Sequence, residues 1–457
     1  MPRVVVIGAG AAGTMASIFA ASAGAETLLV ESTKDGGRKI LISGGGRCNI
    51  LPSRLDESRF VTDSSPRTLR HILRSWPLQE QIAFFEQDLD LPLVEEPAAS
   101  KLFPKSQSAR DVRDKLLAHA RRKGVRVFTD TVVTDLSPSA DGWIIDRQGG
   151  DPLRADAVIV ATGGLSVPST GSDGRGLDIA RRLGHVMHPT YPALTPLTVR
   201  LKPDPTNTQR SGADSELTGG LVASGFSRAS GGLVASGGLV ASGFSRTASP
   251  FGHLSGVSLP VRLTARSDER TAVATGGFLF THHGYSGPSV LDVSHVAVRS
   301  IADTSQPARL TVRWTPLEDA DWNAALRPSG SRTALAAVSE QLPHRLAEAL
   351  LSQARIDLAL PLAQLTRDDR LRLIDTLVRG ELPWTGDEGY KKAEVTGGGV
   401  SLYEIDPKTL ESRKHRGLFF CGEILDAFGP IGGYNFLWAW VTGRAAGIGA
   451  AAHVPQS

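Results

Sequence analysis

The sequence predicts an α/β fold in which a Rossmann-like dinucleotide-binding domain is interrupted by a strand-rich, barrel-like insert with a small helical subdomain. First, the N-terminus reads as one β-α-β unit: an apolar run at Arg3–Ile7, a glycine-rich turn, an alanine-rich helix and an apolar strand at Glu26–Val30. Second, the composition shifts near Pro189, after which strand-like segments dominate. Third, residues 417–446 return to a strand, a glycine-rich turn and a helix, so both chain ends build the first domain.

The remaining elements follow from the spacing of apolar residues. Helices are expected at residues 69–85, 109–123, 333–355, 365–379 and about 435–446. Strands are expected at residues 125–133, 142–146, 156–161, 259–265, 277–281, 310–314 and 417–421. The predicted domains are the dinucleotide-binding domain in two parts, residues 1–190 and 386–457, the strand-rich insert, residues 191–332, and the helical subdomain, residues 333–385.

The composition excludes several classes of protein. At roughly 150 residues per domain, a chain of 457 residues has room for about two to four domains. Its 50 Lys and Arg residues against 47 Asp and Glu residues leave a net charge of +3, which argues against a nucleic-acid partner. The two cysteines, Cys48 and Cys421, lack metal-ligand spacing, so we expect no metal, no disulfide framework and a reducing compartment.

The apolar start of the chain, residues 4–30, does not read as a targeting segment or a membrane anchor. Its glycines and Glu26 interrupt the apolar run that either would need. We therefore expect a cytoplasmic protein without a membrane partner, and the sequence leaves its oligomeric state open.

A short repeat lies in the middle of the insert. The unit GLVASGFSR begins at Gly220 and again at Gly238, within a glycine- and serine-rich stretch at residues 204–249. This repeat is too short for a solenoid, so we expect a surface insertion without fixed structure. The alternative is a docking segment for a partner.

The glycine-rich turn GAGAAG predicts a dinucleotide site. Gly8 allows a sharp turn, Gly10 allows the backbone to approach a pyrophosphate, and Gly13 allows the strand and helix to pack closely. The helix that follows presents free N–H groups to phosphate. Glu31, at the end of the second strand, is suited to accept hydrogen bonds from ribose hydroxyls and disfavours a 2′-phosphate.

A second block, GGRKILISGGGRCN at residues 36–49, predicts a backbone cradle for a planar ring or a pyrophosphate. Lys39, Arg47 or both are candidates to neutralise phosphate. Arg47 would also lower the pKa of the neighbouring Cys48 thiol, although we interpret Cys48 as a packing or ring-edge thiol.

Two later glycine-rich turns complete the predicted site. The ATGG turn at residues 161–164 follows a buried strand, as in many flavoproteins. Near the C-terminus, Gly432 and Gly433 would let a helix begin against a flavin, where its dipole stabilises a reduced ring, and Asp426 would bind a ribityl hydroxyl. A second GxGxxG turn after a strand is absent, so no fixed NAD(P) domain is expected.

These blocks, together with FTHHGYSGPSVLDVS at residues 280–294, resemble the BaiN/YhiN-like (aminoacetone-oxidase-like) family of bacterial FAD-dependent oxidoreductases. The resemblance implies a Rossmann-like FAD-binding domain and FAD as the cofactor. The predicted cofactor-binding residues are Gly8, Gly10, Ala12, Gly13, Glu31, Lys39, Ser43, Gly45, Gly46, Arg47, Asn49, Val133, Ala161, Thr162, Gly163, Gly164, Gly422, Glu423, Asp426, Gly432, Gly433, Tyr434 and Asn435.

Candidate catalytic residues lie in the insert. His282, His283 and Tyr285 form a cluster of titratable groups beside glycines, and a histidine there would protonate a substrate during hydride transfer. The alternative is that they are strand-end residues hydrogen-bonded to the backbone.

We therefore expect an FAD-dependent oxidoreductase that moves a hydride between flavin N5 and a small organic substrate, with NAD(P)H or O2 as the other redox partner. A fumarate-reductase-like or ketosteroid-dehydrogenase-like reductase is the alternative, because the ATGG and TGSDGRG turns are similar to theirs. From another class, an FAD-containing tRNA-modifying protein or a flavin-binding interaction protein stays open.

Overall fold

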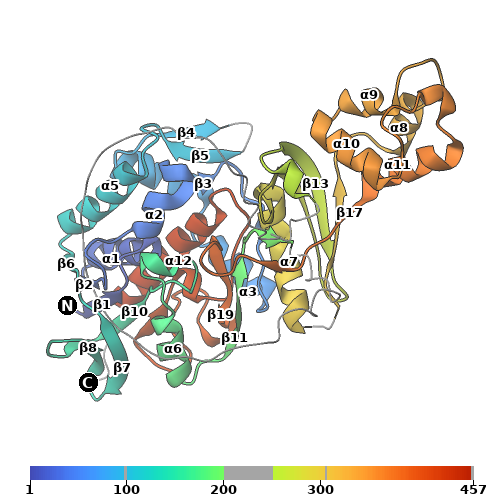
Figure 1. Cartoon of the computed structure of the whole chain (residues 1–457). Helices are drawn as coiled ribbons and strands as arrows, with labels where there is room; N and C mark the ends of the chain where they lie inside the picture. Colours follow the sequence, from blue (N-terminus) through green and yellow to red (C-terminus); the bar gives the residue numbers. More distant parts are fainter. Residues whose placement is uncertain (97–99, 200–250, 304–305, 454–457) are drawn as a thin grey trace, which may run out of the picture.

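The structure is a computed structural model that describes residues 1–96, 100–199, 251–303 and 306–453 (Figure 1). The repeat at residues 204–249 lies outside the described residues, so the expectation about it stays untested.

A parallel sheet forms the centre of the first domain. Its strand order is β20-β10-β1-β2-β6, and every pairing in it is parallel. The strands are β1 (Arg3–Ile7), β2 (Glu26–Val30), β6 (Arg126–Phe128), β10 (Ala157–Val160) and β20 (Leu418–Phe420). Because β20 comes from the C-terminal segment, the two ends of the chain meet in one sheet, as the sequence predicts. The apolar runs of β1 and β10 are buried, as expected for parallel strands with both faces covered.

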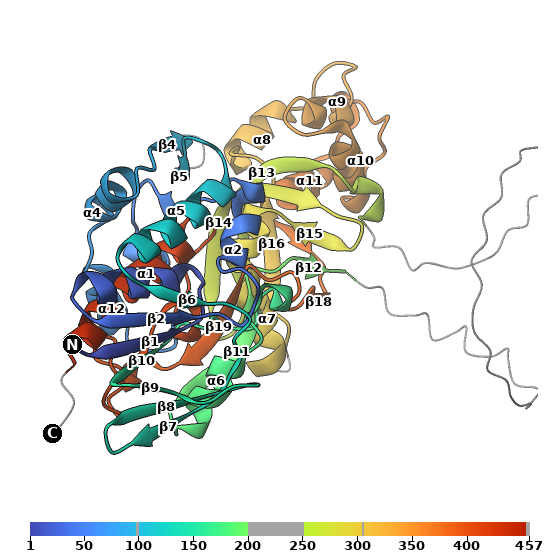
Figure 2. The ribbon, with the colours of Figure 1, turned by 90° about the vertical axis from the view of Figure 1, so that its left-hand side faces the viewer.

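Helices α1 (Ala11–Ser22) and α12 (Tyr434–Ala451) pack along each other on one face of this sheet (Figure 2). Two glycines of α12 allow the close approach. A Cβ atom at Gly443 would lie 2.4 Å from the Ala12 oxygen, and one at Gly447 would lie 2.3 Å from the Ala16 oxygen. On the other side lies an antiparallel sheet of β7 (Val133–Ser139), β8 (Gly142–Arg147) and β9 (Leu153–Ala155) (Figure 2).

The insert contains a separate antiparallel sheet with strand order β17-β16-β13-β14-β15-β12-β18. Its strands are β12 (Leu197–Thr198), β13 (Ser258–Arg266), β14 (Thr271–Phe280), β15 (Gly284–Ser286), β16 (Arg309–Arg313), β17 (Gly380–Leu382) and β18 (Gly386–Asp387). Helix α7 (Pro288–Asp303) was not among the predicted elements. It packs against β13 and β14 and also contacts β11 (Met187–Ala193), which pairs with β19 (Val395–Val400).

Four helices form a lobe beside the insert sheet: α8 (Asp319–Ala325), α9 (Ala334–Ser339), α10 (His344–Gln353) and α11 (Arg367–Arg379) (Figure 1). They share one hydrophobic core with the sheet, in which Trp314 and Trp322 are buried with Leu346 and Leu373. The parallel sheet has its own core, in which α1, α12 and the strands pack together.

The remaining helices and strands belong to the first domain and lie around its central sheet. The helices are α2 (Arg38–Ile42), α3 (Pro66–Leu73), α4 (Leu78–Ala83), α5 (Ala109–Arg122) and α6 (Arg175–Arg182), and the strands are β3 (Leu51–Pro52), β4 (Leu93–Glu96) and β5 (Lys101–Pro104). Two predicted helices are each divided at a proline. Pro77 separates α3 from α4, and Pro343 separates α9 from α10, because proline disfavours helical conformation in the residue before it and lacks an N–H donor.

The predicted fold class is confirmed: a Rossmann-like parallel sheet is combined with a separate antiparallel, strand-rich insert. None of the helices in the described part of the chain combines the length and the apolar character that crossing a membrane requires.

Candidate active site

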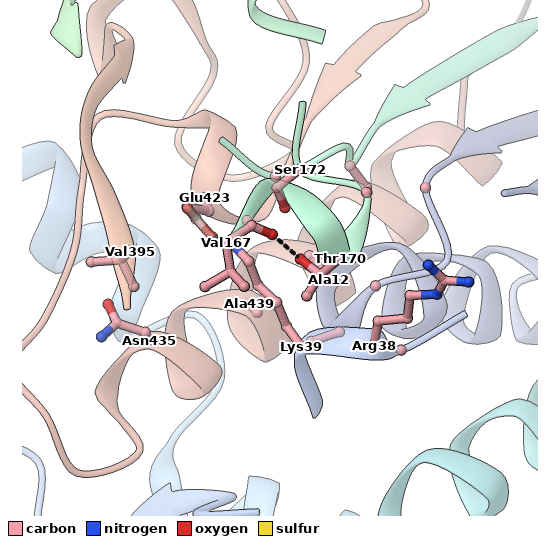
Figure 3. Close-up of a pocket in the computed structure, with 18 of the residues that line it drawn as sticks. Ala12, Arg38, Lys39, Val167, Thr170, Ser172, Val395, Glu423, Asn435 and Ala439 are labelled. Atoms are coloured by element: carbon pink, nitrogen blue, oxygen red, sulfur yellow. Dashed lines mark hydrogen bonds and ion pairs between the residues drawn. The ribbon is translucent and has the colours of Figure 1, made fainter. Parts of the chain in front are cut away.

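A cavity of about 460 Å³ lies at the carboxyl ends of the central parallel strands, where ligands bind in open α/β sheets. Residues from distant chain segments converge on it. Figure 3 shows Lys39 of α2, Val167 after β10, Glu423 after β20 and Asn435 of α12 around the same space. In this view Val395 and Asn435 lie at one end and Arg38 lies at the other.

The glycine-rich turn after β1 has the geometry of a phosphate-binding turn. Gly8 has φ +101°, and a Cβ atom there would lie 2.6 Å from the Ala161 oxygen. A Cβ atom at Gly13 would lie 1.9 Å from the Gly8 oxygen, so this glycine serves strand–helix packing, as predicted. A Cβ atom at Gly10 has no neighbour within 4 Å, and Gly10 lines the cavity.

Helix α1 begins beside this opening. Gly10 is its N-cap and makes no side-chain capping bond, while Ala11 and Ala12 line the cavity. The first N–H groups of a helix have no partner within the helix, so they are free to bind an anion.

Glu31 lies at the end of β2, lines the cavity and is 7% exposed. Its Oε2 accepts a hydrogen bond from the Ala9 N–H at 2.8 Å. Its Oε1 accepts hydrogen bonds from the Thr33 N–H at 2.8 Å and from the Thr33 hydroxyl at 2.7 Å. The carboxylate therefore fixes the glycine-rich turn against the loop after β2, and its remaining lone pairs stay available to ribose hydroxyls.

A partly buried polar cluster joins four chain segments, and its Lys39 and Glu423 line the cavity. The Lys39 ammonium contacts Glu423 Oε2 at 2.6 Å and the Ser166 hydroxyl at 2.6 Å. Glu423 Oε1 accepts from the Ser166 hydroxyl at 2.6 Å and from the Thr396 N–H at 3.0 Å. Lys39 is thus already paired with a carboxylate, which reduces the charge that it offers to a phosphate.

The start of α12 forms the other end of the site. Gly433 is its N-cap with φ +89°, and a Cβ atom there would lie 2.4 Å from the Leu51 carbonyl carbon. In the amide orientation that satisfies both of its ends, the Asn49 nitrogen donates to the Leu51 oxygen at 3.3 Å and the Asn49 oxygen accepts from the Gly433 N–H at 3.0 Å. Asn435 brackets the preceding loop, because it accepts from the Gly429 N–H at 2.9 Å and donates to the Gly429 oxygen at 3.0 Å.

Most of the predicted cofactor-binding residues line this cavity. They are Gly8, Gly10, Ala12, Glu31, Lys39, Ser43, Gly45, Arg47, Asn49, Val133, Ala161, Thr162, Gly163, Gly422, Glu423, Gly432, Gly433 and Asn435. The structure does not bring Gly13, Gly46, Gly164, Asp426 or Tyr434 to the cavity wall.

Asp426 does not line the cavity, although the sequence predicts that it binds a ribityl hydroxyl there. It is instead buried among hydrogen-bond donors of the protein. It is 2% exposed, and its Oδ2 accepts from the Ser64 hydroxyl at 2.8 Å, the Asp63 N–H at 2.9 Å and the Thr62 hydroxyl at 3.0 Å. Burial raises the pKa of Asp426, although the hydrogen bond from Ser64 and the nearby His188 lower it.

Two further predicted residues serve packing. The Tyr434 hydroxyl donates to the Arg54 oxygen at 3.3 Å, and its ring packs against Phe60. A Cβ atom at Gly164 would lie 2.4 Å from the Thr396 hydroxyl, so this glycine allows the turn after β10 to approach β19.

The predicted catalytic cluster lies away from the cavity wall. His282 and His283 are exposed at the turn between β14 and β15. Tyr285 is 1% exposed within the core of the insert, where its ring packs against Phe278 and Phe280. This geometry gives the three side chains no contact with a ligand in the cavity.

The Cys48 thiol is fully buried, and burial raises its pKa to about 12. The expectation that Arg47 lowers this pKa is wrong, because the guanidinium points away and lies over the Phe103 ring, 4.2 Å from its centroid. Cys48 is therefore a packing residue.

Sequence reasoning missed several lining residues. They are Arg38, Lys101, Phe103, Leu194, Glu394, Val395, Phe428 and Ile431. Val395 begins β19, Leu194 directly follows β11 and Glu394 directly precedes β19, whereas Lys101 and Phe103 belong to β5. Arg38 lies within the glycine-rich block at residues 36–49 but was not singled out. The signal for Glu394 was only an acid directly before the glycine-rich strand β19.

The fold and the cavity together define a dinucleotide-binding protein of the flavoprotein type. The sequence profile of the HI0933-like protein Rossmann domain matches residues 2–449. The chain therefore belongs to the HI0933-like family of FAD-binding oxidoreductases, which confirms the resemblance found in its motifs.

Two characterised relatives match over nearly their full lengths. The 3-dehydro-bile acid delta(4,6)-reductase of Clostridium scindens is 30% identical over 99% of this chain and 99% of that protein. The ribosomal RNA dihydrouridine synthase of Escherichia coli is 31% identical over 95% of this chain and 94% of that protein. Among solved structures, the 3-ketosteroid-delta4-(5alpha)-dehydrogenase of Rhodococcus jostii is similar with a TM-score of 0.45 and 16% identity, covering 98% of this chain and 96% of that chain.

The residues of the cavity fit FAD. Cβ atoms built at Gly10 and Gly45 meet nothing within 4 Å, so the backbone at both points is open to a ligand. The Thr162 hydroxyl, in the turn after β10, is buried and has no hydrogen-bond partner among the described residues. Free N–H groups at the start of α1 and the Glu31 carboxylate supply the pyrophosphate and ribose partners that a dinucleotide requires.

Proposed function

We propose that this protein is an FAD-dependent reductase that transfers a hydride to a carbon–carbon double bond conjugated with a carbonyl group. When bound, FAD supplies a ring that accepts a hydride from one partner and passes it to another. The observation that carries the proposal is one cavity that extends from Glu31 and the start of α1 to the start of α12. This extent supports a dinucleotide at one end with its ring beside a substrate at the other.

In this proposal each end of the cavity has a distinct role. The N–H groups at the start of α1 bind the pyrophosphate, and Glu31 accepts hydrogen bonds from the ribose. The positive end of α12, which begins after Gly433, stabilises negative charge on a reduced ring. The apolar side chains of Leu194, Phe428 and Ile431 line the cavity and support an environment from which water is partly excluded.

The two characterised relatives support the reaction class. One is named for reducing delta(4,6) double bonds of a 3-dehydro-bile acid, and the other for making dihydrouridine. Both names describe addition of two hydrogens to a double bond conjugated with a carbonyl group, although the substrates differ. We take a small organic molecule as the substrate and NAD(P)H as the source of the hydride, in place of the oxidase reaction with O2.

The test is a half-reaction that does not depend on the electron donor. The holoenzyme is photoreduced without oxygen and mixed with a 3-oxo-4-ene bile acid, or with the saturated 3-oxo bile acid as the matched control. We expect the unsaturated compound alone to restore the oxidised flavin spectrum, with a product heavier by two hydrogens. Reoxidation by O2 but by no unsaturated carbonyl compound would favour the oxidase alternative.

A second candidate substrate is a uridine in RNA. The relative from Escherichia coli carries the name of an RNA-modifying enzyme, and α3 borders a surface groove lined by Arg67, Arg70, His71 and Arg74. Such a groove suits phosphates, although Arg74 is paired with Glu57 at 2.8 Å. The low net charge that argued against nucleic acid does not describe this local surface.

This candidate predicts binding to a uridine-containing RNA that weakens steeply as salt increases. The double substitution Arg67→Glu and Arg70→Glu should abolish that binding and leave FAD content unchanged. Binding that is insensitive to both salt and the substitutions would reject the RNA candidate and leave the small-molecule substrate.

A further inference from the structure

Glu394 places a carboxyl group at the end of the cavity near α12. It directly precedes β19, and its N–H donates to the Leu194 oxygen at 3.2 Å. Its neighbour Val395 pairs with Ala193 of β11 and lies beside Asn435 of α12 in Figure 3. Glu394 is among the residues that line the cavity, and it is exposed.

The other carboxylates that line the cavity are all engaged. Glu31 accepts from backbone N–H groups and Glu423 binds Lys39, as described above. Asp35 pairs with Arg38 at 3.0 Å and Arg113 at 3.2 Å, and Asp173 pairs with Arg175 at 2.9 Å. In the part of the chain that the structure describes, by contrast, no hydrogen bond or ion pair engages the Glu394 carboxyl.

The surroundings of Glu394 favour its protonated form. Partial burial raises the pKa of Glu394, while the positive charge of Lys39 lowers it. That ammonium is held by Glu423 and Ser166, so its charge is partly balanced. Lys101, beside Gly432, and Arg47, over the Phe103 ring, are further cations that line the cavity. A carboxyl group whose pKa is raised and that lines a ligand space can act as a general acid.

We infer that Glu394 is the catalytic acid that protonates the substrate at this end of the cavity. The inference rests on the proposed function. In the reaction, the β-carbon of the unsaturated carbonyl compound receives a hydride, with both its electrons, from the reduced flavin. The π electrons of the double bond move to the α-carbon, which takes the proton from the Glu394 carboxyl. The products are the saturated carbonyl compound, oxidised flavin and the Glu394 carboxylate, which regains a proton from solvent.

The geometry favours Glu394 over the other candidate acids. His282, His283 and Tyr285 do not line the cavity. Among thiols, Cys421 lines the cavity, but it is fully buried and burial raises its pKa above the ordinary thiol value, so it is a weaker proton donor than a carboxyl group.

The test compares Glu394→Gln with the wild-type holoenzyme and with Glu388→Gln, a matched change in the same segment outside the cavity wall. The first measurement is the visible spectrum of the oxidised holoenzyme between acidic and alkaline pH. Ionisation of a carboxyl beside the ring should shift the bound flavin spectrum in the wild type and in Glu388→Gln. Glu394→Gln should lose this shift and keep the FAD content.

The second measurement is reoxidation of the photoreduced holoenzyme by the 3-oxo-4-ene bile acid. Glu394→Gln should slow this step by about 10²–10⁴-fold, the range typical of general acid catalysis, and Glu394→Asp should recover part of the rate. A wild-type rate or an unchanged spectral titration in Glu394→Gln would overturn the inference. Loss of FAD from this variant would also overturn it, because Glu394 would then hold the cofactor.

The outcome separates this inference from the proposed function. If the wild-type enzyme is reoxidised and Glu394→Gln is equally fast, the function stands and the acid is another group. If no unsaturated carbonyl compound reoxidises the wild type, the function fails, and the loss of the spectral titration in Glu394→Gln decides whether Glu394 still ionises beside the ring.

Discussion

The Lys39 ammonium and the Glu423 carboxylate lie 2.6 Å apart, although they come from opposite ends of the chain. Their side chains are 26% and 18% exposed. Through Ser166 and Thr396, which also bind Glu423, the pair connects α2, the turn after β10 and β19 on one wall of the cavity. The glycine-rich segments of both chain ends are therefore fixed by one carboxylate.

Removing this carboxylate should destabilise the fold. In Glu423→Ala, the donors Lys39, Ser166 and Thr396 lose their shared acceptor, so we expect the free energy of unfolding to fall by about 2–4 kcal/mol. Urea unfolding measures this. Glu381→Ala is the control, because its ion pair with Arg309 is exposed, and it should change stability by less than about 1 kcal/mol. Equal losses in both variants would contradict the role of the Glu423 cluster.

Two glycines of one turn should respond differently to substitution. Gly10→Val places its side chain in the open cavity, so it should fold with nearly wild-type stability but bind FAD poorly. Gly13→Ala places a Cβ atom against the Gly8 oxygen, so it should lower the unfolding temperature. FAD content and thermal unfolding of the apoproteins separate the two effects. Unchanged FAD occupancy in Gly10→Val would reject the pyrophosphate assignment.

Glu31→Gln should weaken FAD binding by about 1–3 kcal/mol, because charge-assisted hydrogen bonds to the ribose are replaced by weaker ones. The amide can accept only at its oxygen, so the contact with either Ala9 or Thr33 is also lost. Fluorescence titration of the apoprotein with FAD measures the affinity. An unchanged dissociation constant would reject the ribose role of Glu31.

Asp292 should make stability depend on pH. Burial raises the pKa of Asp292 to about 6, while the Ile431 N–H, at 2.8 Å from Oδ1, Arg59 and Lys101 lower it. An aspartate in the unfolded chain has a pKa of about 3.9, so the unfolded state loses its proton first as pH rises. The free energy of unfolding should therefore fall by about 2–3 kcal/mol between about pH 4 and pH 6.

Asp292→Asn keeps the acceptor for Ile431 but removes the ionisation. It should match the wild type near pH 4 and be more stable than the wild type above pH 6, where the wild-type carboxyl is charged. Urea unfolding across this range measures the difference. Asp178→Asn, on the exposed side of α6, should leave the profile unchanged. Identical profiles for Asp292→Asn and the wild type would contradict the prediction.

Local sequence signals predicted the framework well. The β-α-β unit at Arg3–Ile7 and Glu26–Val30 and the turn at residues 161–164 are where the sequence expects them, because glycine and buried β-branched runs have strong local requirements. Helix α7 was missed because it begins at Pro288 directly after a strand-like segment with glycines, where no change of period marks the boundary.

The candidate site was predicted only in part. Residues held by glycine motifs were found, but Glu394 reaches the cavity through the pairing of β19 with β11, a contact between distant segments that no local pattern reveals. The opposite error occurred at Asp426, which lies within a glycine-rich block but turns into the protein to meet Ser64. Sequence proximity to a motif does not determine the direction of a side chain.

The most direct test of the central claim is the visible spectrum of the purified protein, recorded without oxygen while NADH and then NADPH are added. We predict a bound flavin spectrum that is bleached by one of the two nucleotides, as a nicotinamide-driven reductase requires. A colourless protein that cannot be reconstituted with FAD would contradict the assignment of the cavity.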